Sequence, residues 1–265
     1  MRSTAPIADP EKVYLRNVHP DIRASVFPSH IQIARDNGYK FIKYDDVDKH
    51  DKFIILRHDI DLDLRLAGEM AELEHSCGVT STYFIMLHNE LYNTGSLAHR
   101  EVLRNMQKLG HTIGLHFDPT VWAPYRGEDL PGLIEKEVHW LSDLAGTKVH
   151  WVSFHQPDAY FLNNDIVGNG FESVYNSRFT RGMRYIADSM GMWREEPVSE
   201  LFRRNDTPKI QFLSHPANWF HEEALTLNER MGRLVARQQA RLPHLFAHAI
   251  NAPPRKLVLY VPDSK

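Results

Sequence analysis

The chain has 265 residues, 42% of them hydrophobic, and a formal net charge of −3 at pH 7 with histidine counted as neutral. This length and composition suffice for one large core, and the small charge gives no overall electrostatic reason to bind nucleic acid or an anionic membrane. The single cysteine, Cys77, excludes an internal disulfide and a metal site made of cysteines alone, which suits a reducing compartment. The start of the chain lacks the apolar stretch of an export signal and no apolar run is long enough to span a bilayer, so we expect a cytoplasmic protein.

Helices and short strands alternate over the first 155 residues. We expect a short helix over 28–38, an extended piece, and then a strongly apolar strand over 53–56. Apolar side chains that recur every three or four residues predict a helix over 62–77, and the β-branched and aromatic run 79–87 predicts the next strand. The pattern continues with helices over 96–109 and 131–145 and strands over 111–116 and 148–154. Such alternation predicts parallel strands with crossover helices.

The second half of the chain alternates less regularly. Strands are expected over 170–177, 184–189 and 209–216 with little helix between them, followed by a long amphipathic helix over 221–242. Neither a linker nor a sequence repeat marks a domain boundary. We therefore predict one barrel-like domain over 1–265, with an N-terminal helix and extended lead-in (1–50) and a C-terminal helix and tail (221–265).

Each predicted strand ends on polar residues that can do chemistry. The strand-end residues of interest are Asp59, Asp61, His116, His155, Asp188 and His215. In α/β barrels the C-terminal strand ends meet on one face, which carries the active site. One such residue alone is more often a turn-former or a cap, but agreement among several strand ends favours a shared pocket. Carboxylate and imidazole together suit a divalent metal such as Zn²⁺ and therefore indicate metal-assisted hydrolysis.

Four short motifs, LRHDID, GHTIGLH, SFHQP and LSHP, follow one another in this order. Over about residues 28 to 220, they resemble the polysaccharide deacetylase (NodB-homology, carbohydrate esterase family 4-like) superfamily. The resemblance implies a distorted (β/α) barrel of about seven parallel strands and a metal-dependent enzyme that removes N-acyl groups. It also implies that Asp59 is the base, that Asp61 and His116 are metal ligands, and that His215 is the general acid for the departing amine.

Three positions depart from the superfamily's pattern. Ile60 separates two carboxylates that are usually adjacent, Thr120 stands where a second metal-binding histidine is usual, and His155 stands where an arginine usually orients the base. We infer a rearrangement in which His155 supplies the missing ligand and Arg57 orients the base. The rival third ligands are Asp118 and His58. The expected metal is Zn²⁺, with Co²⁺, Ni²⁺ or Fe²⁺ as alternatives.

Further residues are expected to support the site or contact the substrate. Asp188 is expected to hydrogen-bond His215 and raise its pKa, which suits an acid near neutral pH. Trp193 and Trp219 follow strand ends, so each is either an apolar wall for a sugar ring or an ordinary core residue. The remaining substrate-contact candidates are Asn176 and Arg194.

The expected substrate class rests on the same resemblance. The RHDID-type first motif and the HPANWF end resemble deacetylase-like proteins from gene clusters for surface polysaccharide and lipopolysaccharide. Together with a cytoplasmic location, this implies an N-acetyl or N-formyl amino sugar, or its nucleotide- or lipid-linked form, that serves as a precursor of a polysaccharide such as O-antigen. The alternatives are a hydrolase of a non-sugar amide or cyclic imide on the same scaffold, and a catalytically inactive sugar-binding module.

Overall fold

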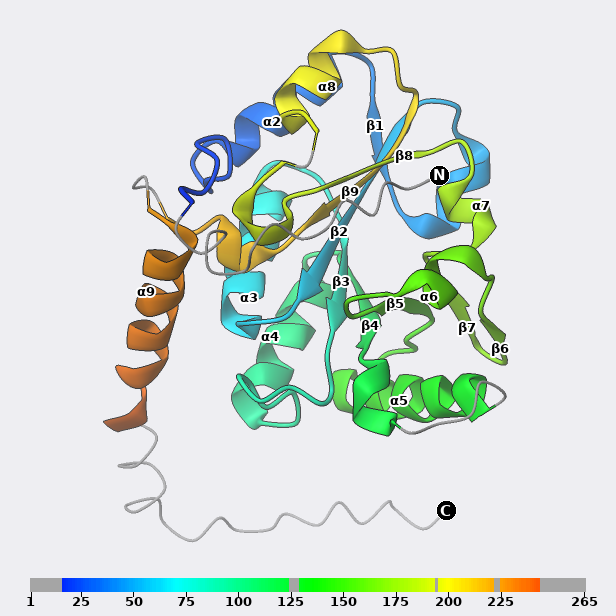
Figure 1. Ribbon diagram of the computed structural model, residues 1–265, viewed down its shortest axis with the longest axis vertical. Helices are drawn as coiled ribbons and strands as arrows, with labels where there is room; N and C mark the ends of the chain where they lie inside the picture. The colour runs from blue at the N-terminus through cyan, green and yellow to red at the C-terminus, as the bar shows by residue number, and fades with distance from the viewer. Residues whose placement is uncertain (1–15, 124–128, 194, 222–224, 244–265) are drawn as a thin grey trace, which may run out of the picture.

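A mostly parallel sheet carries the fold. The structure is a computed structural model that describes residues 16–123, 129–193, 195–221 and 225–243 (Figure 1). The sheet has nine strands in the order β6-β7-β5-β4-β3-β2-β9-β8, and β1 pairs with β2 off this path. Among the described strands, only the β6–β7 pair is antiparallel. The strands are β1 (Lys40–Ile42), β2 (Phe53–Ile60), β3 (Thr82–Ile85), β4 (Thr112–Phe117), β5 (Trp151–Phe154), β6 (Val167–Gly168), β7 (Phe171–Ser173), β8 (Arg184–Ala187) and β9 (Lys209–Ser214).

Helices connect and cover these strands. The helix α3 packs beside α4, which packs beside α5, while α2 lies against α8 at the other end of the molecule (Figure 1). The α-helices are α2 (Phe27–Asp36), α3 (Leu64–Ser76), α4 (Leu97–Lys108), α5 (Leu130–Ala145), α6 (Ala159–Asn163), α7 (Ser177–Thr180), α8 (Val198–Arg204) and α9 (Leu227–Gln239). Short 3₁₀ helices are η1 (Tyr44–Lys49), η2 (Pro119–Trp122), η4 (Ser189–Gly191) and η5 (Pro216–Asn218).

The strand β2 lies at the centre of the sheet. Its first residues pair with β1, its last residues pair with β3, and its other edge pairs with β9 along most of its length. All eight of its residues are buried, including the charged ones. Because both edges and both faces of β2 are covered, the strand is held at a fixed position relative to its neighbours.

The sequence predicts an α/β protein with parallel strands, and the structure confirms this. The described strands do not close into a barrel, since nothing joins β8 at one end of the sheet to β6 and β7 at the other. The strand expected over 53–56 continues to Ile60, because its charged residues find partners inside the protein and do not end the ladder. The helix α8 was not expected, and it occupies a stretch for which we predicted little helix.

Three further predictions concern the C-terminal helix, membrane-spanning segments and the number of domains. The long helix expected over 221–242 is α9, and part of the expected range, residues 222–224, lies outside the described residues. None of the described helices is both long enough and apolar enough to cross a membrane. One domain over 1–265 stays a prediction.

Gly114 in β4 is predicted to tolerate no side chain. A Cβ added there would lie 2.6 Å from the ring of Phe84, which is fully buried, and 3.0 Å from the backbone oxygen of Trp151. We expect Gly114→Ala to lower the free energy of unfolding in urea by about 1–3 kcal/mol, as overpacking of a core does. Gly132→Ala is the control, because a Cβ at that helical position meets no atom within 4 Å and should leave stability unchanged or slightly higher. Equal stability of the Gly114 variant and the wild type would contradict the packing described here.

Candidate metal centre

The alternation of side chains along β2 sorts its polar residues onto two faces. Residues two apart in a strand point to the same side, so Arg57 and Asp59 share one face while His58 points to the other. Asp61 follows directly after the strand. The neighbouring parallel strands β4 and β5 deliver His116 and His155 at the same edge of the sheet, His116 as the penultimate residue of β4 and His155 directly after β5.

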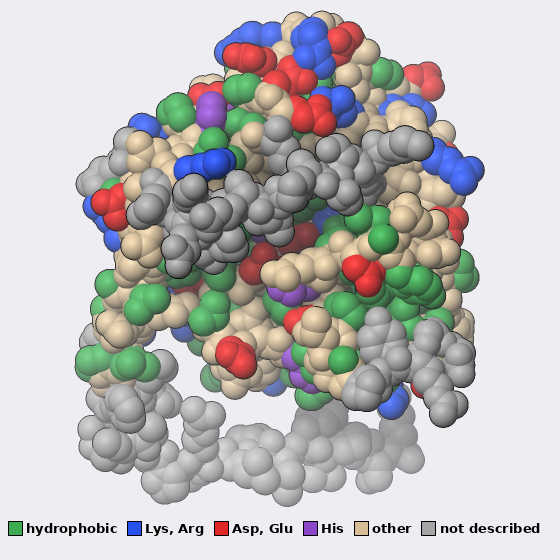
Figure 2. Space-filling model, viewed as in Figure 1, with side chains coloured by type: hydrophobic (Ala, Val, Ile, Leu, Met, Phe, Trp, Pro, Cys, Tyr) green, Lys and Arg blue, Asp and Glu red, His purple; other side chains and the backbone are tan. Residues whose placement is uncertain are grey.

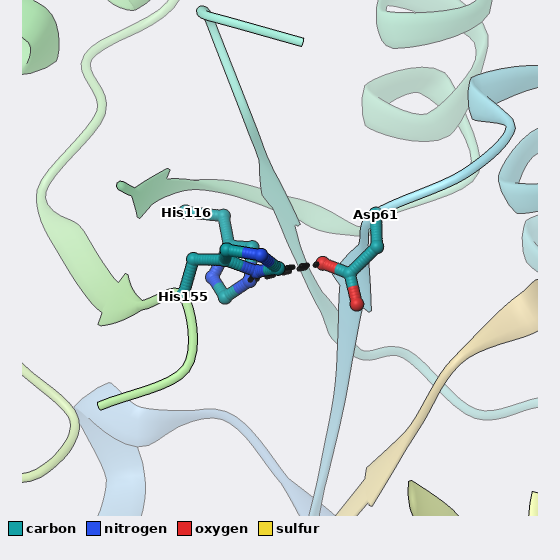
Figure 3. A group of neighbouring side chains, drawn as sticks. All are labelled: Asp61, His116 and His155. Atoms are coloured by element: carbon teal, nitrogen blue, oxygen red, sulfur yellow. Dashed lines mark hydrogen bonds and ion pairs between the residues drawn. The ribbon is translucent and has the colours of Figure 1, made fainter. Parts of the chain in front are cut away.

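Asp61, His116 and His155 point their polar atoms at one another (Figure 3). The distance from Asp61 Oδ1 to His116 Nε2 is 3.1 Å, and to His155 Nδ1 it is 3.3 Å. The two ring nitrogens lie 3.3 Å apart. The backbone N–H of His155 donates to the carbonyl of Phe117 at 2.8 Å, which continues the β4–β5 pairing and helps to hold the ring of His155 beside that of His116.

These three residues fit a divalent cation of the zinc type. Zinc bonds to nitrogen and oxygen are about 2.0–2.1 Å long, so two ligand atoms of a tetrahedral site lie about 3.3–3.4 Å apart. The three observed separations are close to that value. Asp61 Oδ1 is also buried and, although both imidazoles lie close to it, it accepts no well-aligned hydrogen bond, which is costly unless another group compensates it. Burial alone would raise the pKa of Asp61, but His116 and His155 hold it well below its usual range, so the carboxylate is charged.

A serine fixes the orientation of His116. His116 Nδ1 lies 2.7 Å from Ser153 Oγ, on the residue directly opposite in β5, and Ser153 Oγ donates to Asp59 Oδ1 at 3.4 Å. If the serine hydroxyl donates to Asp59, it accepts from His116 Nδ1–H, which leaves Nε2 unprotonated and free to bind a metal. These hydrogen bonds link His116, a candidate metal ligand, to the second carboxylate, Asp59.

Arg57 holds Asp59 in place from inside the sheet. Its guanidinium is fully buried and donates to Asp59 Oδ2 at 2.7 Å, to Tyr175 Oη at 3.1 Å and to Gln211 Oε1 at 3.1 Å. Burial alone would raise the pKa of Asp59, but the charge of Arg57 outweighs burial and holds the pKa below its usual range. Asp59 is therefore an oriented carboxylate that is ionised at neutral pH.

His215 faces the same centre from the end of β9. Its Nε2 lies 3.8 Å from Asp61 Oδ2, and its Nδ1 lies 2.6 Å from Asp188 Oδ1. Asp188 also accepts the backbone N–H of His215 at 3.0 Å and the indole N–H of Trp219 at 2.7 Å. Burial lowers the pKa of His215, but the negative charge and hydrogen bond of Asp188 outweigh it and raise the pKa to about 9.

The rival ligands are engaged elsewhere. Asp118 caps η2, where its Oδ1 accepts from the backbone N–H and the hydroxyl of Thr120. His58 lies on the other face of β2, with Nδ1 2.8 Å from Ser214 Oγ and Nε2 2.8 Å from Glu74 Oε1. Neither side chain belongs to the group of three.

The predicted substrate-contact residues have structural partners. Trp219 is fully buried and Trp193 is 8% exposed, so neither offers a free ring face for a sugar, and Trp219 instead holds Asp188. The side-chain oxygen of Asn176 accepts the backbone N–H of Ile166 at 3.0 Å. Arg194 lies outside the described residues.

Sequence reasoning missed several residues that support the site. Ser153, Tyr175 and Gln211 were not singled out, although each contacts a residue that was. Ser153 stands two positions before His155 and so shares its strand face, which was a usable signal.

Figure 2 shows acidic and histidine side chains gathered in a hollow near the middle of one face of the molecule.

Known proteins resemble the chain in structure. No protein-family model matches it, and no curated protein matches its sequence. A family 4 carbohydrate esterase from Bacillus anthracis is 15% identical, with 80% of this chain and 86% of that one covered and a TM-score of 0.37. A deacetylase from Streptococcus pyogenes is 13% identical, with 80% and 91% covered and a TM-score of 0.43. A peptidoglycan deacetylase from Bacillus subtilis is 12% identical, with 76% and 96% covered and a TM-score of 0.43. The names of these three proteins describe them as an esterase and two deacetylases, the class of enzyme that the four sequence motifs resemble.

Metal content is predicted to depend on all three residues of the group. We expect about one transition-metal ion per chain in the wild type and its loss in Asp61→Ala, His116→Ala and His155→Ala, because a structural or catalytic zinc needs at least three protein ligands. Plasma mass spectrometry on tag-free protein measures this. Asp118→Asn is the matched control and should keep its metal. Full metal content in the His155 variant, or loss in the Asp118 variant, would reverse the assignment of the third ligand.

The His215–Asp188 pair is predicted to make stability depend on pH in the metal-free protein. The pKa of His215 is raised from 6.5 to about 9. The contribution of the protonated ring to the free energy of unfolding is therefore fully present below pH 6.5 and is lost as the pH rises through about 9. A shift of this size corresponds to about 3 kcal/mol. We expect the difference in unfolding free energy between wild type and His215→Gln to shrink by roughly that amount from pH 6 to pH 10. His139→Gln, on the exposed side of α5, should show no such change.

Proposed function

We propose that the chain is a metal-dependent hydrolase that removes an N-acetyl or N-formyl group from an amino sugar. The proposed substrate is a cytoplasmic precursor of a surface polysaccharide, such as the O-antigen of lipopolysaccharide. The observation that carries the proposal is that Asp61, His116 and His155 form a compact ligand group with Asp59 and His215 at its edges. The four motifs supply the sugar as the substrate class, because they resemble carbohydrate deacetylases.

Asp61, His116 and His155 would hold the cation, and Zn²⁺ suits their two nitrogens and one oxygen best. When bound, such a cation supplies Lewis-acid activation of a carbonyl oxygen and of water. Co²⁺, Ni²⁺ and Fe²⁺ suit the same donor atoms. The chain's own residues then have to move two protons, one from the attacking water and one to the departing nitrogen.

Asp59 is the proposed general base. Its two oxygens are held by Arg57 and Ser153, so the carboxylate cannot rotate freely, and its side chain is nearly buried. A base in a fixed position next to the reacting water removes its proton as the C–O bond forms. Arg57 acts through Asp59 and is therefore a positioning residue.

His215 is the proposed general acid. Asp188 takes up Nδ1 and the backbone N–H of His215, so the other ring nitrogen, Nε2, is the one that faces Asp61. A proton on Nε2 can pass to the amine nitrogen when the amide C–N bond breaks, which makes the amine a good leaving group. Trp219 supports this arrangement by donating to the second oxygen of Asp188.

Removal of either proton-transfer group is predicted to slow turnover strongly and leave the metal in place. We expect Asp59→Asn and His215→Ala to lower kcat on N-acetyl or N-formyl amino sugars by on the order of 10² to 10⁴. The readout is release of acetate or formate, with metal content measured in the same samples. His139→Gln is the control and should keep full activity. Turnover of cyclic imides or non-sugar amides without turnover of amino sugars would favour the alternative hydrolase, and sugar binding without any turnover in metal-loaded wild type would favour a binding module.

A further inference from the structure

A pocket lies beside the segment that follows β2, the segment that also carries Asp61. It has a volume of about 540 Å³ and is lined by the start of α3, the segment after β3, the start of α4 and the end of α9. Asp61 belongs to the metal group and Asp63 lines this pocket, so the backbones of the two sites lie at most about 7 Å apart at this point. Asn89 donates to the carbonyl of Asp61 at 2.9 Å and Tyr92 to that of Ile60 at 2.7 Å, which ties the wall of the pocket to the end of β2.

Two arginines line this pocket together with one carboxylate, Asp63. Arg65 and Arg241 both line it, and among the described residues Arg65 forms no ion pair. Burial lowers the pKa of Arg241, and the nearby charges of Arg65 and Arg237 lower it further, against the opposite effect of Asp63. Two guanidinium groups that repel each other at the lining of a cavity are a suitable site for an anion, since guanidinium binds phosphate in a bidentate manner.

Asp63 contributes a carboxylate oxygen that forms an ion pair with Arg241 but accepts no hydrogen bond. Its Oδ1 caps α3 by accepting from the backbone N–H groups of Arg65 at 2.7 Å and Leu66 at 3.3 Å. Its Oδ2 is buried without a hydrogen bond, 3.7 Å from the nearest guanidinium nitrogen of Arg241. The side chain is 3% exposed. A buried acceptor without a hydrogen bond is costly, and a hydroxyl group of a ligand in this pocket would donate one to it.

The rim of the same pocket is apolar. Leu91, Val235 and Leu242 line it and are 49%, 50% and 46% exposed, which is unusual for large hydrophobic side chains that lie around one cavity. The pocket therefore combines a cationic part with an apolar part. Inorganic phosphate or a free sugar would use only one of these parts.

We propose that this pocket, the Arg65–Arg241 pocket, binds the phosphate ester that links the amino sugar to its carrier. Arg65 and Arg241 bind the phosphate oxygens, Asp63 Oδ2 accepts from a hydroxyl group, and the apolar rim packs against the base of a nucleotide or the chain of an isoprenoid. The inference rests on the proposed function and deepens it, because it makes a carrier-linked amino sugar the substrate. The proposal requires one molecule to extend from this pocket past the Asp61–Asp63 segment to the residues Asp61, His116 and His155.

Titration calorimetry on the metal-loaded protein tests the pocket. The probes are a uridine diphosphate N-acetylhexosamine, a short isoprenyl phosphate and the unphosphorylated N-acetylhexosamine. We expect at least one of the two phosphate esters to bind, and its affinity to fall by at least about tenfold in Arg65→Gln and in Arg241→Gln, as the loss of a charged hydrogen bond predicts. The control is Arg104→Gln, an exposed residue of α4 outside the pocket, which should bind like the wild type.

The outcomes separate the pocket from the proposed activity. Binding of the nucleotide alone identifies a nucleotide carrier, and binding of the isoprenyl phosphate alone identifies a lipid carrier. Ester binding that depends on both arginines supports the pocket even if no acyl group is released. Esters that bind no better than the free sugar, or equally well to the two arginine variants, overturn the pocket, and release of acetate or formate from the free sugar would then leave the proposed activity standing.

Discussion

The buried ion pair between Arg57 and Asp59 is the interaction on which the rest of the site depends. Burying two charges is costly, and additional hydrogen bonds offset part of that cost. Here Gln211 from β9 and Tyr175 after β7 accept from the two terminal nitrogens of Arg57, whose Nε is buried without a hydrogen bond, and Ser153 from β5 donates to Asp59. The guanidinium of Arg57 thus connects β2 to β9 on one side and to the segment after β7 on the other. Asp59, which lies beside the group Asp61, His116 and His155, is held in a fixed position by these contacts.

The other face of β2 carries a matching polar cluster. His58 contacts Glu74 of α3 and Ser214 of β9, and Glu74 also accepts from Ser81 at 2.6 Å and Tyr83 at 2.8 Å. Because Ser214 precedes His215 and His58 precedes Asp59, this cluster joins the two strands that carry the proposed acid and the proposed base. The strands that carry Asp59 and His215 are therefore joined by side-chain hydrogen bonds on both faces of the sheet, through His58 on one face and Arg57 on the other.

Sequence reasoning grouped Asp61, His116 and His155 because their closeness depends on local features. Strands end on recognisable polar residues, and parallel strands bring these ends together. The sequence alone therefore predicts that three of these residues lie close to one another, namely Asp61, His116 and His155. Other features depend on contacts between distant segments. The burial of Trp219, the engagement of His58 with Glu74 and the open edge at β8 follow from packing, which no spacing in the chain reveals. The predicted strand ended at residue 56, before the true end of β2 at Ile60, for the same reason. Charged residues can continue a buried strand only if they have partners inside the protein, and the sequence does not show that Arg57 and Asp59 pair with each other.

The single residue Ile60 between the two carboxylates determines to which face of the chain each of them points. In an extended strand, neighbouring side chains point to opposite faces, so Asp59 and Asp61 can share a face only because one residue separates them. Ile60 itself is buried on the opposite face, 1% exposed. A chain with directly adjacent carboxylates has to bend its backbone to bring both to one side. The single-residue spacing is therefore part of what places both carboxylates beside the candidate metal site, and deletion of Ile60 would turn one of them to the opposite face.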